Sequence, residues 1–158
     1  MNGKIVAGAI VATALIAGAA IYYLQVYAFY RPIEAGSALA AIEVAHVDTG
    51  APESLATRDF TGIDADSSPL RYRSCFVTPT TLATMTETYQ PYDKPTPLNA
   101  PTWFTCFDAA RIGADLDSGA AVAFLSHKNI RPSVDRVIAV YPDGRAYGWQ
   151  QLNESADQ

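Results

Sequence analysis

Residues 134–152, VDRVIAVYPDGRAYGWQQL, contain two runs of strand-forming residues separated by a tight turn. The first run is rich in β-branched residues, which favour extended strands. Between the runs, Pro142 and Gly144 are placed as in a type I turn, and the second run begins after Arg145. The stretch therefore predicts a β-hairpin and, with it, an antiparallel sheet.

The segments before this hairpin mix strand and helix patterns without a regular βαβ order. We expect strands at residues 41–47, 60–63 and 70–78, helices at residues 80–89 and 108–117, a short helical turn within residues 52–60, and a proline-rich extended loop at residues 91–101. Residues 120–128 favour a helix, with a buried strand as the alternative. The mixture predicts an α+β fold with an antiparallel sheet and a few helices.

The amino-terminal segment is the most apolar part of the chain. Residues 5–30 contain no charged side chain, and about 20 apolar residues in a helix are enough to cross a bilayer. Aromatic residues gather at its far end: Tyr22, Tyr23, Tyr27, Phe29 and Tyr30. Because aromatic rings favour the headgroup level, we expect these side chains to mark a membrane interface. The chain thus divides into a tail and transmembrane helix at residues 1–34 and a separate domain at residues 35–158.

A cleaved signal peptide is the main alternative to this anchor. Lys4 would be its basic region, and the small residues Gly18, Ala19 and Ala20 would suit a cleavage site. The apolar run continues well past Ala20, however, and is longer than the usual core of a signal peptide. We therefore favour an anchor that is retained in the lipid bilayer.

The orientation of the anchor depends on weaker signals. Lys4 precedes the span and Arg31 follows it, so the basic residues are nearly balanced. A short tail is easily left in the cytoplasm, and a domain with two cysteines and an acidic surplus suits an exported compartment. We expect the amino terminus in the cytoplasm of a bacterium, the helix in its inner membrane and the domain in its periplasm.

Small residues recur along the predicted span. Ala9, Thr13 and Ala17 are spaced by four residues, and Ala14 and Gly18 form a second row with the same spacing. Such rows allow another helix to approach closely. The alternative is an alanine-rich anchor of no special function. We favour docking of this helix against a larger integral membrane complex.

Cys75 and Cys106 are the two cysteines of the chain. An even number of cysteines on the oxidising side of a membrane suggests one disulfide. Two separate buried thiols are the alternative. A redox or copper site would usually require the cysteines much closer together in the sequence.

The two histidines do not belong to a recognisable site. His46 and His127 each stand alone, and neither lies in an H-x-x-H or H-E-x-x-H pattern. No serine elbow, Walker loop or G-x-G-x-x-G motif occurs. We therefore expect no catalytic residue, cofactor or metal, and no enzymatic activity.

An acidic loop is the nearest approach to a metal-binding motif. Asp64 and Asp66 alternate as in part of a calcium loop, but the glycine and the later glutamate of that loop are missing. We expect the two carboxylates to cap turns or to contact Arg71 and Arg73.

Composition limits the remaining possibilities. The chain has 158 residues, so its soluble part is a single domain of ordinary size. The net charge of -5 argues against nucleic acid as a partner. The aromatic residues of the domain are expected to form its core: Trp103, Phe104, Phe107, Tyr141, Tyr147 and Trp149.

Three stretches resemble a family of short single-span proteins from Rhodobacter-like alphaproteobacteria. They are residues 1–30, residues 59–76 (DFTGIDADSSPLRYRSCF) and residues 134–154. The family is a domain of unknown function, and its members are sometimes labelled histidine kinases. The resemblance implies a photosynthetic or respiring Gram-negative host and a periplasmic domain, but no activity. The kinase label does not fit this chain, because His46 and His127 lack a phospho-acceptor motif and no nucleotide-binding motif is present.

These observations favour a non-catalytic accessory subunit of an inner-membrane energy-converting complex. A respiratory oxidase or a cytochrome bc complex of the electron-transport chain is the expected host. A transient assembly or quality-control factor is the first alternative, since it would use the same anchor. A periplasmic ligand-binding domain is the second alternative, and a pocket with inward-facing charged residues would favour it.

Overall fold

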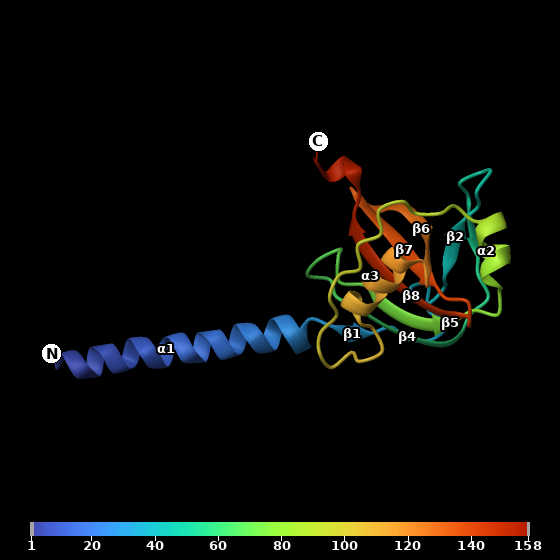
Figure 1. Cartoon of the computed structure of the whole chain (residues 1–158). Coiled ribbons are helices and arrows are strands. Elements are labelled where there is room, and N and C mark those ends of the chain that lie inside the picture. The colour runs from blue at the N-terminus through green and yellow to red at the C-terminus, as the bar shows by residue number, and fades with distance from the viewer. Residues whose placement is uncertain (1, 158) are drawn as a thin grey trace.

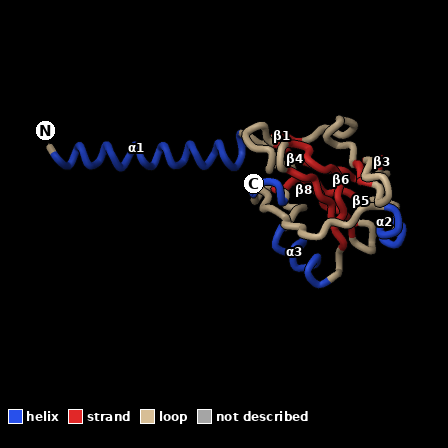
Figure 2. The backbone as a smooth tube through the Cα atoms, turned by 90° about the horizontal axis from the view of Figure 1, so that it is seen from above, coloured by secondary structure: helices blue, strands red, loops and turns tan. Residues whose placement is uncertain are grey.

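The computed structural model describes residues 2–157 and shows a long helix that projects from a mixed α+β domain (Figures 1 and 2). The helix α1, Gly3–Tyr23, continues into the π-helical segment Leu24–Ala28. No residue of α1 is buried, and residues Gly3–Ala28 are long and apolar enough to cross a membrane. The helix begins at Asn2, whose side chain accepts a hydrogen bond from the Lys4 amide.

The domain is built on a six-stranded antiparallel sheet in the order β1-β4-β5-β8-β7-β6. Its strands are β1 Arg31–Pro32, β4 Arg58–Asp64, β5 Arg73–Val77, β6 Val122–Arg131, β7 Val134–Val140 and β8 Arg145–Leu152. A second, two-stranded sheet pairs β2, Glu43–Ala45, with β3, Pro52–Ser54. Two helices, α2 Leu82–Thr88 and α3 Ala109–Ser118, and a 3-10 turn, Glu154–Asp157, complete the domain. The predicted α+β class is confirmed.

Local sequence signals explain where the two domain helices begin and end. The Thr81 side chain accepts a hydrogen bond from the Thr84 amide and caps α2. Asp108 caps α3 in the same way, through the Arg111 amide. Helix α3 ends at Gly119, whose φ of 78° is the left-handed conformation that glycine adopts easily. The helices expected at residues 80–89 and 108–117 are therefore confirmed.

The two faces of the sheet are both covered. Along β7, Ile138 and Val140 belong to a cluster that includes residues of β2 and α2, whereas Val137 and Ala139 pack with α3 and the preceding loop. Every residue of β7 is buried as a result. The members of the α3 cluster are Ile63, Cys75, Phe104, Phe107, Ile112, Ala123, Val137, Ala139 and Trp149. Burial on both faces accounts for the nearly continuous apolar run of this strand.

The predicted hairpin is confirmed. Strands β7 and β8 pair from Val134 opposite Leu152 to Val140 opposite Ala146. At the turn, the Gly144 amide donates to the Tyr141 carbonyl at 3.0 Å. Gly144 has a φ of 87°, and a β-carbon placed there would lie 2.6 Å from the Thr78 carbonyl oxygen. Both the backbone conformation and the space available at this turn therefore require glycine.

Gly144→Ala should lower the free energy of unfolding by about 1 to 3 kcal/mol, because alanine is strained at this φ. Thermal or denaturant unfolding followed by tryptophan fluorescence measures the loss. Gly113→Ala is the matched control, since a β-carbon at Gly113 in α3 meets nothing within 4 Å. That change should be neutral or slightly stabilising. Equal losses in the two variants would show that the turn does not depend on glycine.

Two expected helical segments are strands. Residues 52–54 form β3, because Pro52 and Ser54 pair with Ala45 and Glu43 of β2, and residues 58–60 begin β4. Residues 120–128 lie mostly in β6, which pairs with β7. An apolar run that is buried on both faces has no alternation to distinguish it from a buried helix, so periodicity alone misassigned it.

The connection between helix and domain is short. Arg31 and Pro32 form β1, where Arg31 lies opposite Asp64 and Pro32 opposite Ile63. The Ile33 amide continues this pairing by donating to the Gly62 carbonyl at 2.8 Å. The chain therefore enters the sheet almost directly after the helix.

Candidate functional site

The end of the long helix is fastened to the domain by two side chains. Arg71 donates to both the backbone and the side-chain oxygen of Gln25, at 2.9 and 2.6 Å. The indole nitrogen of Trp103 donates to the Val26 carbonyl at 2.7 Å. The last carbonyls of a helix have no partner within the helix, so they are free to accept these bonds. We call this set of contacts the junction.

Aromatic rings surround the junction. Trp103 lies 6.5 Å from Tyr27 and 6.0 Å from Tyr30, measured between ring centroids. Tyr27 in turn lies 5.9 Å from Tyr23, and the Arg71 guanidinium lies over Tyr30 at 5.2 Å. Of the aromatic residues predicted at a membrane interface, Tyr22, Tyr23, Tyr27 and Phe29 are exposed at this end of the helix, whereas Tyr30 is half-buried.

Trp103 departs from the prediction that the aromatic residues of the domain form its core. Its exposed fraction is 36%, and it faces the helix rather than the sheet. Phe104, Phe107 and Trp149 are core residues, as expected. Only the fold brings Trp103 to residues near the amino terminus, so no local signal could have predicted this contact.

The predicted disulfide is confirmed. Cys75 in β5 is bonded to Cys106 in the loop that precedes α3, and their α-carbons lie 6.4 Å apart. The bond joins the centre of the sheet to a long irregular segment. Arg73 holds the same segment through the Leu98 and Asn99 carbonyls, at 2.7 and 3.0 Å. Burial lowers the pKa of Arg73 to about 10, so the side chain is still protonated at neutral pH.

The small residues of the helix all lie on an exposed surface. Ala9, Thr13, Ala14, Ala17 and Gly18 contact no part of the domain, and a β-carbon at Gly18 would meet nothing within 4 Å. The arrangement leaves this face free for lipid or for another helix.

The histidines serve local structure. His46 accepts a hydrogen bond from the Asp48 amide at 3.2 Å through its Nδ1 atom. His127 lies 3.6 Å from a Glu43 carboxylate oxygen. Within residues 2–157, no group of three or more histidine, cysteine, aspartate or glutamate side chains could hold a metal ion.

Asp64 and Asp66 form no ion pair with Arg71 or Arg73, which was one of their two expected roles. Asp64 accepts a hydrogen bond from the Ala65 amide at 2.8 Å, and Asp66 lies 3.7 Å from Arg31 at the surface. Both aspartates instead line a pocket of about 420 Å³ beside the sheet. The other lining residues are Leu39, Ala65, Ser68, Pro69, Ile130, Arg131, Arg136 and Gln150. We call it the charged pocket.

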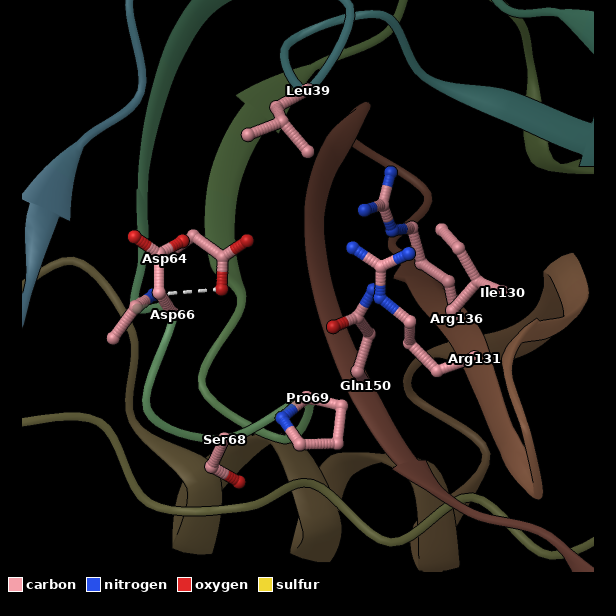
Figure 3. A pocket seen from close by; sticks show the side chains of 10 residues that line it. Leu39, Asp64, Asp66, Ser68, Pro69, Ile130, Arg131, Arg136 and Gln150 are labelled. Carbon is pink, nitrogen blue, oxygen red and sulfur yellow. Dashed lines mark hydrogen bonds between the residues drawn. The ribbon is translucent and has the colours of Figure 1, made fainter.

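The charges of this pocket are separated by sign. Figure 3 shows Asp64 and Asp66 on one side and Arg131 and Arg136 on the other. Asp64 ends β4, whereas Arg131 ends β6 and Arg136 lies in β7. In the part of the chain that the structure describes, no ion pair joins the two sides within 4.0 Å.

Arg136 is unusual because it is buried without an acidic partner. Only 7% of the residue is exposed, and its guanidinium lies 4.0 Å above the Tyr72 ring. With its amide oriented to satisfy both neighbours, Gln150 donates to the Pro69 carbonyl and accepts from Arg136 at 3.2 Å. The Nε atom of Arg136 has no hydrogen-bond partner among the described residues. Among the described residues, the Gln150 oxygen is therefore the one acceptor for the guanidinium's five N–H donors.

The neighbouring Asp135 shows the opposite situation. Its carboxylate accepts hydrogen bonds from the Tyr92 hydroxyl, the Asn129 amide and the Asn153 side chain, at 3.1, 2.8 and 2.8 Å. Asp135 is thus satisfied within the fold, whereas Arg136 is not. Two neighbouring charged residues, Asp135 and Arg136, stand inside the otherwise apolar run VDRVIAVY. Charged residues at buried strand positions are the sequence signal that could have identified Arg136 as a candidate site residue.

Burial also affects the acidic side of the pocket. It raises the pKa of Asp64, and the Ala65 amide and the positive charge of Arg136 oppose part of that rise. The carboxylate is thus less well solvated than an ordinary surface aspartate. A cation placed next to it would restore some of that lost stabilisation.

The fold defines this chain as an apolar amino-terminal helix followed by an antiparallel α+β domain. A family model described as a family of unknown function (DUF6446) matches residues 42–158, and the chain belongs to that family. The match covers the domain and leaves out the amino-terminal helix. No curated protein and no solved structure matches the chain.

Proposed function

We propose that this protein is a non-catalytic, single-span accessory subunit of a larger inner-membrane complex. The observation that carries the proposal is the junction, in which Arg71 and Trp103 of the domain hold the carbonyls of Gln25 and Val26. An anchor that only tethers a domain needs a flexible linker. A domain held at a set position relative to its helix suits a subunit that must meet its partner both in the membrane and above it.

The orientation that we propose places the amino terminus in the cytoplasm and the domain in the periplasm. The Cys75–Cys106 disulfide supports it, because disulfides persist in oxidising compartments. The exposed aromatic residues at the end of the helix fit a headgroup level next to the domain, whichever way the helix crosses.

Docking through the helix is supported by its exposed small residues. Helices in lipid associate by close van der Waals packing, and small side chains permit it. The energy-converting class of the partner, a respiratory oxidase or a cytochrome bc complex, rests on the resemblance to single-span proteins of respiring alphaproteobacteria.

Mild solubilisation of native membranes tests the proposal. A tagged full-length chain should migrate with a large membrane assembly and should bring its subunits along. Migration of the chain alone, at the size of a monomer, would contradict it. Stoichiometric amounts in the purified, active complex identify a subunit. Trace amounts, present only while the complex forms, identify the alternative, a transient assembly factor.

The junction makes a separate prediction about geometry. Spin labels placed at Ile16 in α1, which projects from one side of the domain, and at Glu87 in α2, on the far side of the domain, should give a narrow distance distribution (Figure 1). In the double variant Arg71→Ala, Trp103→Ala the distance distribution should broaden. This variant loses the hydrogen bonds of the junction, each of which contributes on the order of 1 kcal/mol. Arg58→Ala, an exposed change in β4 away from the junction, is the control and should change nothing. Equal widths in all three proteins would show that β1 alone sets the domain position.

A further inference from the structure

The charged pocket offers a function beyond membrane docking. The sequence leaves a ligand-binding domain open as an alternative function, and inward-facing charges of opposite sign are what favour it. We infer that the charged pocket binds a free α-amino acid, with the carboxylate at Arg131 and Arg136 and the ammonium group at Asp64 and Asp66. Binding there does not depend on whether the helix docks on a partner.

Arg136 is the main reason to expect a carboxylate. A buried charge is costly unless it is paired, yet only a ring face and the Gln150 amide contact Arg136 among the described residues, and Asp64 acts on it from beyond ion-pair distance. A planar guanidinium matches a carboxylate with two parallel hydrogen bonds, and stacking on Tyr72 holds its plane in place. Arg131 adds a second, exposed cation at the same side of the pocket.

The opposite side explains why the ligand is expected to be a zwitterion. Asp64 and Asp66 face the arginines across the pocket (Figure 3) and would repel a multiply charged anion such as phosphate. An ammonium group beside Asp64 is attracted instead, and Asp66, which is exposed and lies 3.7 Å from Arg31, adds a second carboxylate at the rim of the pocket. A molecule that carries both charges satisfies both sides at once, and it leaves the lining as a whole close to neutral.

The size and the remaining lining are consistent with an amino acid. A volume of about 420 Å³ lies within the range of small-molecule sites. Leu39 and Ile130 provide apolar surface beside the charges, where an aliphatic side chain could lie.

The test uses the full-length chain in detergent micelles. Each of the proteinogenic amino acids is added singly in a thermal-shift measurement, and those that stabilise the domain are titrated by calorimetry. At least one should bind saturably, whereas acetate and methylamine, which each carry one of the two charges, should bind at least tenfold more weakly. Inorganic phosphate should not compete.

Variants assign the binding to this pocket. Arg131→Gln and Asp66→Asn change exposed side chains, so the domain stays folded, and each should weaken binding at least tenfold. Arg136→Gln should abolish binding, and unfolding followed by fluorescence checks that it still folds. Arg111→Gln, an exposed arginine of α3 outside the pocket, is the matched control and should bind normally. Failure of every amino acid to bind, binding that survives Arg131→Gln and Asp66→Asn, or tighter binding of phosphate would overturn the inference.

Discussion

Replacing Cys75 and Cys106 together with alanine should lower the free energy of unfolding of the domain by about 3 to 4 kcal/mol. The disulfide closes a loop with a sequence separation of 31, and opening it gives the unfolded chain more conformations. Alanine is preferred to serine, because Cys75 is buried and a hydroxyl would lose its hydration there. The midpoint of thermal unfolding should fall by roughly 10 °C or more.

Tryptophan fluorescence measures this loss through Trp149, which lies in the domain core, whereas Trp103 reports on the junction with the long helix. Reduction of the unchanged protein serves as the control and should reproduce the lower midpoint. An equal midpoint with and without the bond would contradict the prediction. Two freely alkylated thiols in the unreduced, unfolded protein would remove both the disulfide and the support that it lends to a periplasmic location.

Ala14→Leu combined with Gly18→Leu should reduce retention of the chain in its complex by roughly tenfold, which corresponds to about 1.4 kcal/mol. Bulky side chains on this face would keep the backbone of a partner helix at a distance. A β-carbon at Gly18 meets nothing within 4 Å in the chain itself, so the loss would report on the partner alone. Retention is measured as the amount of partner recovered with the tagged chain.

Leu15→Ile on a neighbouring face is the matched control and should leave the recovery unchanged. The unfolding midpoint of the domain should be the same in all three proteins, because the domain has its own core. Full recovery of the partner with the double variant would mean that this face is exposed to lipid. Docking would then have to come from the domain.

The sequence predicted those parts of the fold whose signals are local. The hairpin could be predicted because Pro142 and Gly144 define its turn. Helices α2 and α3 could be predicted because their caps and periodic apolar residues lie within a few positions of one another. Strands β3 and β6 could not be predicted in this way. The conformation of β3 depends on pairing with β2, and that of β6 on burial between two layers, so neither is encoded in its own residues alone.

The candidate sites were less predictable than the fold. The Cys75–Cys106 bond followed from the cysteine count, since no other pairing is possible within the chain. The junction joins Trp103 to Val26, and the charged pocket brings Asp64 opposite Arg136, across large separations in the sequence. Such contacts follow from the order of the strands in the sheet, which patterns of hydrophobicity do not specify.

Photo-crosslinking in intact native membranes tests whether the helix docks on a membrane complex. A photoreactive amino acid is placed at Ala14 in one protein and at Leu15 in another, which point in directions about 100° apart around the helix. If the helix docks through its small residues, position 14 should give a discrete protein–protein adduct, identifiable by mass spectrometry as one subunit of an energy-converting complex, and position 15 should give mainly lipid adducts. Lipid adducts alone from both positions would contradict docking of this helix on a membrane complex.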